Sequence, residues 1–199
     1  MTIQEFFERS VGRWRSQRSG HHLVALPTGS ATGEAQPGLP PSDQRKATLD
    51  VQKLTVDDPA VVSLCQSAQP KINRPVNPSV DLSVIYPLSI SWEEEGGLSS
   101  RNKPKGSTVL ALIPDPDNDN FGTVLQAKGQ GRYELGTDER LTIWTENELG
   151  KLEERFWFAS ENLRFRLLVQ HNTGDNQAKL PLAVFYSEIR LLNPKPAES

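Results

Sequence analysis

The spacing of hydrophobic and polar positions predicts a short helix at the N-terminus. Three apolar side chains fall on one side of the first helical turns: Ile3, Phe6 and Phe7. Thr2 and Glu5 have the spacing of a capping box, in which each residue satisfies a backbone N–H of the first turn. We therefore expect an amphipathic helix over residues 2–9, after which Gly12 opens an extended segment.

Most of the remaining chain alternates with a period of two, which is typical of strands. Turn residues such as Gly, Pro, Asn and Asp separate the alternating segments. After the extended segment we expect strands at about residues 21–26, 46–56, 82–93, 106–113, 123–128, 131–135, 140–147, 152–158, 163–171 and 180–192.

Two segments depart from this alternation. Residues 28–46 are rich in Gly, Pro, Ser and Thr and nearly free of large apolar side chains, so we expect a mobile insertion there. Asp58 followed by Pro59 supplies an N-cap and a proline at the first helical position. Apolar residues then follow at helical spacing, which predicts a second short helix over residues 58–68.

Many antiparallel strands joined by short turns predict an all-β fold, either a sandwich or a closed barrel. The first helix leads directly into Gly12 and Trp14, an arrangement in which the helix closes the base of a barrel and the tryptophan packs against it. We therefore favour a lipocalin-like antiparallel β-barrel of about ten strands, which is wide enough to hold one small ligand.

The composition predicts one soluble domain over residues 1–199. With 36% hydrophobic residues, a chain of this length can bury a core without metals or disulfides. The longest strictly apolar run, residues 109–113, is too short to cross a bilayer, and the first ten residues do not resemble a secretory signal. A single cysteine suggests a reducing compartment, such as the cytosol or a plastid stroma. A net charge of -3 argues against nucleic acid as a partner.

Two arginines two positions apart are the first candidates for chemistry. Alternation places Arg164 and Arg166 on one face of a strand, while the apolar residues between them fall on the other face. Glu154, on the preceding strand, is a possible neighbour on the same face. Alternation alone allows two interpretations: a solvated outer face with cross-strand ion pairs, or a ligand cavity lined by charges.

Other candidate residues extend this cluster or can be set aside. Tyr186, Glu188 and Arg190 share one face of the last strand. Trp92 and Trp157 offer flat apolar surfaces, although tryptophans in such strands are often part of the core.

We expect neither a metal site nor a nucleophile. Residues 21 and 22 are adjacent histidines that would point in opposite directions, so they cannot share a zinc ion. Residues 115–119 lack the glycine and the closing glutamate of a calcium loop and are interpreted as a turn. Cys65 lies on the apolar side of the second predicted helix, where burial would make its thiol inert.

Several segments, in chain order, together resemble one family, the S-type phycobiliprotein lyases of cyanobacteria and phycobilin-containing plastids. They are residues 6–18, 106–109, 113–116, 131–135, 154–166 and 187–190. The resemblance implies a lipocalin-like barrel that binds a linear tetrapyrrole. It also implies transfer of this pigment, through a thioether bond, to a cysteine of an apo-phycobiliprotein subunit of the beta or allophycocyanin type.

Carried over position by position, the resemblance assigns the binding of the two pigment propionates to Arg164 and Arg166. It assigns the catalytic carboxylates, which face the pyrrole nitrogens, to Glu154 and Glu188. Flat side chains could cover the pigment rings: Trp92, Trp157 and Tyr186. Phycocyanobilin or phycoerythrobilin would be bound as substrate, with no further cofactor. We expect that alanine at either arginine would abolish transfer while the fold survives.

Two other functions remain open at this point. The same pocket could serve a bilin carrier that performs no transfer, or the accessory half of a heterodimeric lyase; a homodimer is equally compatible. A fatty-acid carrier barrel would need only one arginine and a tyrosine for one carboxylate, so paired arginines and two glutamates argue against it.

Overall fold

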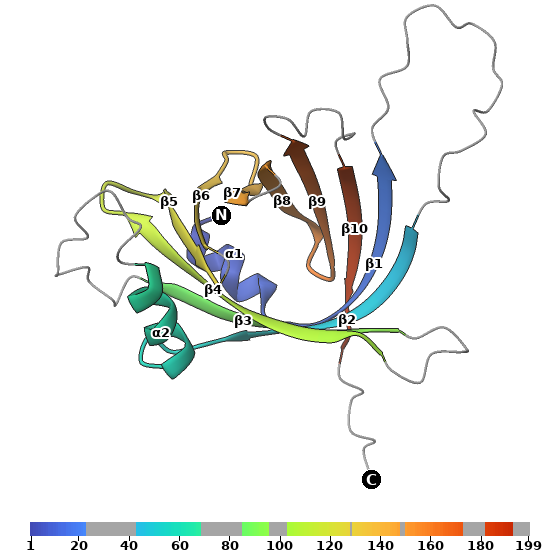
Figure 1. The fold of residues 1–199 in the computed structure, drawn as a ribbon, viewed down its shortest axis with the longest axis horizontal. Coiled ribbons are helices and arrows are strands. Elements are labelled where there is room, and N and C mark those ends of the chain that lie inside the picture. The colour runs from blue at the N-terminus through green and yellow to red at the C-terminus, as the bar shows by residue number, and fades with distance from the viewer. Residues whose placement is uncertain are drawn as a thin grey trace, which may run out of the picture.

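The computed structural model describes residues 1–22, 43–68, 85–95, 103–127, 129–147, 150–172 and 182–192. They form a closed barrel of ten antiparallel strands with two helices, which confirms the predicted all-β barrel (Figure 1). The elements are α1 (Ile3–Ser10), β1 (Gly12–His22), β2 (Asp43–Lys53), α2 (Pro59–Ala68), β3 (Tyr86–Glu94), β4 (Lys105–Asp115), β5 (Asn118–Gln126), β6 (Gly129–Leu135), β7 (Leu141–Asn147), β8 (Gly150–Ser160), β9 (Leu163–Asn172) and β10 (Leu182–Arg190).

Each strand pairs with its neighbours in the chain, and β1 closes the barrel by pairing with both β2 and β10. Closure leaves no unpaired sheet edge among these strands. It also brings the first strand beside the last, so that Ser16 lies directly opposite Glu188. This contact between distant parts of the chain helps to build the site described below.

Helix α1 lies within the ring of strands and fills one end of the barrel (Figure 1). The predicted capping box is present: the Thr2 hydroxyl accepts from the Glu5 N–H at 3.2 Å, and the Glu5 carboxylate accepts from the Thr2 N–H at 2.7 Å. The apolar face of α1 packs into the core of the barrel through Ile3, Phe6 and Phe7. Burial of side chains of this size stabilises the fold by about 1.5–3 kcal/mol each.

The junction between α1 and β1 fixes Trp14 at the base of the barrel, as predicted. Trp14 is completely buried, and its indole N–H donates to the Ser10 carbonyl at 2.9 Å. Gly12 has a φ of 125°, and a side chain there would also meet the Arg190 guanidinium, since a Cβ would lie 2.7 Å from its Nη1. Arg190 in turn donates to the Val11 carbonyl at 2.6 Å, which ties the end of α1 to β10.

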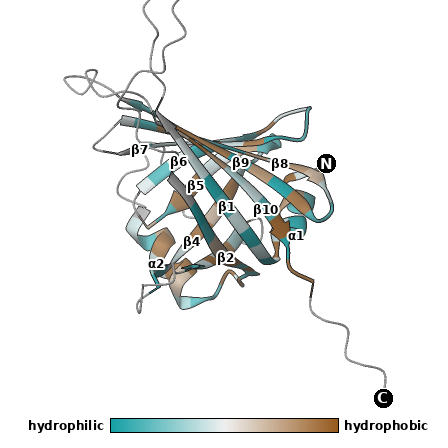
Figure 2. Ribbon diagram, turned by 90° about the vertical axis from the view of Figure 1, so that its right-hand side faces the viewer, coloured by the Kyte–Doolittle hydropathy of each residue, from teal (hydrophilic) through white to brown (hydrophobic). Residues whose placement is uncertain are grey.

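Helix α2 lies against the outer face of β4 and β5 (Figure 1). Leu64 packs there with Ala111 and Leu125. The predicted N-cap is present, because the Asp58 carboxylate accepts from the Ala60 N–H at 2.9 Å. Hydrophobic and hydrophilic residues both occur along α1 and along the strands in Figure 2, as expected for elements with one buried face.

Several predicted strand boundaries were wrong. The strand expected over residues 46–56 ends at Lys53, and the one expected over residues 123–128 begins at Asn118. Residues 21–22 are not the start of a separate strand but the end of β1, because this strand continues without a break from Gly12. The segment expected to be a mobile insertion is also shorter at its C-terminal end: β2 begins at Asp43, where its backbone pairs with Gly20 of β1. Residues 23–42, which include the rest of both predicted segments, lie outside the described part of the chain.

Candidate functional site

A cavity of about 620 Å³ lies inside the barrel, and every strand contributes to its wall. Phe6, Phe7 and Ser10 of α1 line one end of it. Its volume lies within the range of small-molecule binding sites. The wall includes an apolar stretch on β2 to β4, formed by Leu49, Val51, Leu88, Ile90 and Leu110, and the same strands also contribute Arg45, Lys46 and Glu94. Charged side chains line the side of β1 and β8 to β10: Arg18, Glu154, Arg164, Arg166 and Glu188.

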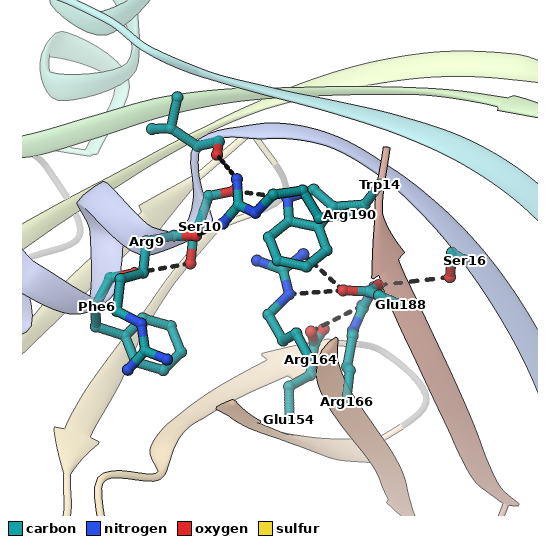
Figure 3. Close-up of polar contacts among 11 residues, drawn as sticks. Phe6, Arg9, Ser10, Trp14, Ser16, Glu154, Arg164, Arg166, Glu188 and Arg190 are labelled. Carbon is teal, nitrogen blue, oxygen red and sulfur yellow. Dashed lines mark hydrogen bonds and ion pairs between the residues drawn. The ribbon is translucent and has the colours of Figure 1, made fainter. Parts of the chain in front are cut away.

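An ion pair between Arg164 and Glu188 lies at the base of this charged wall (Figure 3). The two residues are directly opposite on β9 and β10. The Nε and Nη2 of Arg164 donate to one Glu188 oxygen, Oε2, at 2.7 and 2.6 Å, and the Ser16 hydroxyl donates to the other oxygen at 3.4 Å. The side chains are only 7% and 1% exposed, so the pair is almost wholly buried.

The ring of Trp14 packs against the guanidinium of this ion pair. The guanidinium carbons of Arg164 and Arg190 lie 4.7 and 4.2 Å from the centroid of its ring. A cation over a tryptophan face is stabilised by the quadrupole of the ring. Burial, and then the nearby charge of Arg164, lower the pKa of Arg190. Trp14 therefore fixes Arg164 in place and couples the site to the end of α1.

A second ion pair, between Arg166 and Glu154, is more accessible (Figure 3). The Arg166 Nη2 lies 2.8 Å from the Glu154 Oε2, and the side chains are 26% and 15% exposed. No described group accepts a hydrogen bond from the buried Arg166 Nε. Burial by itself lowers the pKa of Arg166, but Glu154, Tyr186 and Glu188 outweigh this effect, and the pKa is raised. Arg166 thus stays positively charged and keeps a hydrogen-bond donor for a ligand.

The structure brings most of the predicted site residues together. Glu154, Arg164, Arg166, Tyr186 and Glu188 all line the cavity, so the interpretation of the arginine face as a solvated outer surface was wrong. The predicted neighbourhood of Glu154 and the arginines is confirmed by the ion pair with Arg166. The Arg166 guanidinium lies over the Tyr186 ring, with the guanidinium carbon 4.8 Å from the ring centroid.

The two predicted tryptophans lie in different places. Trp92 lines the cavity on the apolar side, where its ring covers Gly106 of β4: a Cβ there would lie 2.4 Å from the ring. Trp157 is not part of the cavity, because inward-facing Glu154 and Phe156 leave it on the outer face of β8. It packs there against Phe165 and Phe185, with ring centroids 5.5 and 6.2 Å away.

Sequence reasoning missed some residues that line the cavity. Ser16 and Arg18 follow Trp14 at a spacing of two and therefore share its inward face, so the alternation on β1 could have identified them. Arg45 of β2 also lines the cavity. It could not have been identified because it fell in the segment interpreted as an insertion.

The described candidates for a metal site and for a nucleophile, residues 115–119 and Cys65, are not part of the cavity wall. Among the described residues, no cluster of His, Cys, Asp and Glu could hold a metal ion. Residues 116–117 form the predicted turn between β4 and β5. Cys65 lies on α2, outside the barrel, and burial raises the pKa of its thiol. The described helices include none that is long and apolar enough to cross a membrane.

Comparisons with known proteins point to one family. The family model described as CpeS-like protein matches residues 2–191. A protein named chromophore lyase CpcS/CpeS from Thermosynechococcus vestitus is 36% identical, over 100% of this chain and 98% of its own length. Chromophore lyase CpcS/CpeS 3 from Trichodesmium erythraeum is 35% identical over 96% of this chain and 99% of its own. The phycocyanobilin lyase subunit CpcS from Picosynechococcus is 32% identical over 82% of this chain and 75% of its own.

A solved structure has the same fold. The S-type phycobiliprotein lyase CPES from Guillardia theta superposes with a TM-score of 0.73 at 24% identity, covering 98% of this chain and 95% of the other. The ten-stranded barrel therefore resembles an experimentally known architecture.

Proposed function

Because the chain belongs to the CpeS-like protein family, we propose that it is a chromophore lyase that attaches a phycobilin to a phycobiliprotein. The enzyme binds the free pigment without a covalent bond and presents it to a cysteine of an apo-phycobiliprotein subunit. The names of its relatives, chromophore lyase and phycocyanobilin lyase subunit, support this activity.

The observation that carries the proposal is the two-sided cavity. A phycobilin has a long apolar face, four nitrogens along one conjugated edge and two flexible propionates. The apolar stretch on β2 to β4 suits the rings, and the wall of β8 to β10 supplies cations and carboxylates. Arg166 suits a propionate, because a guanidinium holds a carboxylate through two parallel, charge-assisted hydrogen bonds.

Glu154 suits the pyrrole nitrogens. Its carboxylate is 15% exposed and lies within the cavity, held by Arg166. An ionised carboxylate accepts hydrogen bonds from pyrrole N–H groups and favours the protonated, cationic form of the pigment. Trp92 of β3 can cover a ring of the pigment.

The reaction itself needs no nucleophile from this chain. The thiolate of the acceptor adds to the ethylidene group on the first ring of the pigment, and the proton of the thiol ends on the pigment. Atoms and electrons balance without an oxidant. The barrel contributes by orientation: it holds the pigment so that one carbon and one face meet the acceptor. Cys65 lies on α2 outside the barrel, which agrees with a reaction in which the acceptor supplies the thiolate.

The test is to mix the purified protein with phycocyanobilin and an apo-subunit, and to follow colour that survives denaturation in acidic urea. A lyase increases the yield of covalent adduct over the same mixture without the protein, and the adduct is absent when the acceptor cysteine is replaced by serine. A coloured complex without any increase in adduct would contradict the proposal and identify a bilin carrier. A fatty-acid carrier would bind oleate and leave the visible band of phycocyanobilin unchanged.

A further inference from the structure

Arg190, the last residue of β10, lies on the same inward face of this strand as Tyr186 and Glu188. Unlike these two residues, it does not line the cavity. Trp14 does not line the cavity either, and its ring lies against the Arg190 guanidinium. Arg190 is therefore out of reach of a pigment in the cavity. Any effect on the reaction must pass through its neighbours, which are the end of α1 and the charged wall.

Arg190 caps the C-terminal end of α1. The last carbonyls of a helix have no partner within the helix, and a cation beside them interacts favourably with the helix dipole. The Arg190 Nη1 donates to the Val11 carbonyl at 2.6 Å, and its Nη2 donates to the Arg9 carbonyl. The Trp14 indole N–H donates to the carbonyl between them, that of Ser10, at 2.9 Å. Two side chains of the barrel therefore hold three successive carbonyls at the end of α1.

This end of α1 belongs to the floor of the cavity. Phe6, Phe7 and Ser10 line the cavity from α1. The Ser10 hydroxyl donates to the Phe6 carbonyl at 2.9 Å, which links two of these residues. The two carbonyls that Arg190 holds belong to the residues on either side of Ser10. The position of the Arg190 side chain therefore determines where the floor of the cavity lies.

The same guanidinium is linked to the charged wall through Trp14. The guanidinium carbons of Arg190 and Arg164 lie 4.2 and 4.7 Å from the centroid of the Trp14 ring. Arg164 in turn forms the buried ion pair with Glu188. Figure 3 shows these contacts in series, from the end of α1 to the ion pairs. The floor and the charged wall thus have one common anchor, which is Arg190 with Trp14.

We propose that Arg190 is a positioning residue for the transfer reaction, because it fixes the floor of the cavity relative to Arg164 and Glu188 and so the place of the reacting carbon of the pigment. This inference rests on the proposed function, in which the barrel contributes by orientation. A misplacement of about 1 Å can lower the rate of an oriented reaction by about a hundredfold. A residue that only capped the helix would change the stability of the fold and leave the rate of transfer unchanged.

The test compares Arg190→Gln with Arg190→Lys in the full-length protein, at a temperature well below all unfolding midpoints. Arg190→Gln is expected to lower kcat for transfer of phycocyanobilin by about ten- to a hundredfold, because the floor loses its charged anchor. The KM for the apo-subunit should change by less than about threefold. The absorbance band of the bound pigment should change in shape. Lysine keeps a cation beside Trp14, so Arg190→Lys should recover part of the lost kcat.

Leu64→Ala is the matched control for stability. Leu64 is 9% exposed and packs between α2 and the outer face of the barrel, away from α1. Its truncation should lower the unfolding midpoint but leave kcat and the absorbance of the bound pigment like those of the wild type. Arg15→Gln is the control for loss of an arginine, because Arg15 lies on the outer face of β1 and pairs with Glu95 at 2.9 Å.

A kcat for Arg190→Gln within about twofold of that for Leu64→Ala would overturn the inference and leave the proposed function intact. Equal losses of kcat in the glutamine and lysine variants, with the wild-type spectrum of the bound pigment, would also overturn it. If Arg190→Gln does not fold, Arg190→Lys decides: it should still lose kcat several-fold, since one nitrogen replaces two, and a wild-type kcat and spectrum would overturn the inference. A wild-type protein without transfer activity would overturn the proposed function itself.

Discussion

Arg164 and Glu188 share one carboxylate oxygen: the Nε and Nη2 of Arg164 donate to the same Glu188 Oε2, at 2.7 and 2.6 Å. Both side chains are almost wholly buried, and Trp14 lies under the guanidinium. Loss of either partner leaves a charge in a region of low polarity, whereas loss of both does not. Removal of one partner should therefore both destabilise the barrel and disturb the charged wall of the cavity.

The first prediction concerns this pair. Arg164→Met should lower the free energy of unfolding by about 3–5 kcal/mol, because Glu188 loses its compensating charge. The double variant Arg164→Met, Glu188→Leu should recover most of this loss. Urea denaturation followed by tryptophan fluorescence measures both. A single variant that loses less than about 1 kcal/mol would show that the pair is dispensable. The sequence predicted lost transfer with an intact fold at this position; the structure adds a cost in stability.

The second prediction separates Arg166 from Arg164. Arg166 is partly exposed, so Arg166→Gln should keep the fold while binding of phycocyanobilin weakens by about 1.5–3 kcal/mol and transfer is largely lost. Arg155→Gln is the control, because Arg155 faces outward from β8 and pairs with Glu153. Titration and the acid-urea assay provide the measurements. Normal transfer by Arg166→Gln would remove this residue from the ligand site.

The third prediction assigns the colour of the bound pigment to Glu154. Glu154→Gln retains the size of the side chain but removes the negative charge that favours the cationic pigment. We expect the long-wavelength band of bound phycocyanobilin to weaken and move to shorter wavelength, with affinity changed by less than about tenfold. Absorbance spectra at saturating protein test this. An unchanged spectrum would mean that Glu154 does not contact the pyrrole nitrogens.

The fourth prediction concerns Cys65. Burial raises the pKa of its thiol, so the thiolate fraction near neutral pH falls below that of an ordinary cysteine, and it increases only as the pH rises. Iodoacetamide at pH 7.5 should therefore alkylate Cys65 more slowly in the folded protein than in urea, as followed by mass spectrometry. Cys65→Ala should retain transfer. A variant that keeps the unfolding midpoint of the wild type but loses transfer would contradict an inert role for this cysteine.

The strands could be predicted because alternation is a local property, but the direction in which each face points could not. On β9 the two choices were equally plausible, since Phe165 and its apolar neighbours could have formed the core. Closure of the barrel determines which face of β9 points inward. The face of Arg164 is the one that meets Trp14 and Glu188, and these residues come from opposite ends of the chain.

Trp157 shows how local reasoning fails when it is not applied throughout. Glu154 and Trp157 are three positions apart on one strand, so they point to opposite faces, and both could not belong to the cavity. The period of two was enough to exclude Trp157. Arg45 illustrates the opposite case: its strand is specified by pairing with β1 rather than by a clear pattern of its own.

The position of α1 has a consequence for the order of events during turnover. Phe6 and Phe7 fill one end of the barrel, so under the proposed function a pigment beside Glu154 would enter and leave at the other end. The acceptor must approach from that side too. Under the proposed function, the pigment must therefore be loaded before the acceptor docks, and a second pigment can enter only after the product has left.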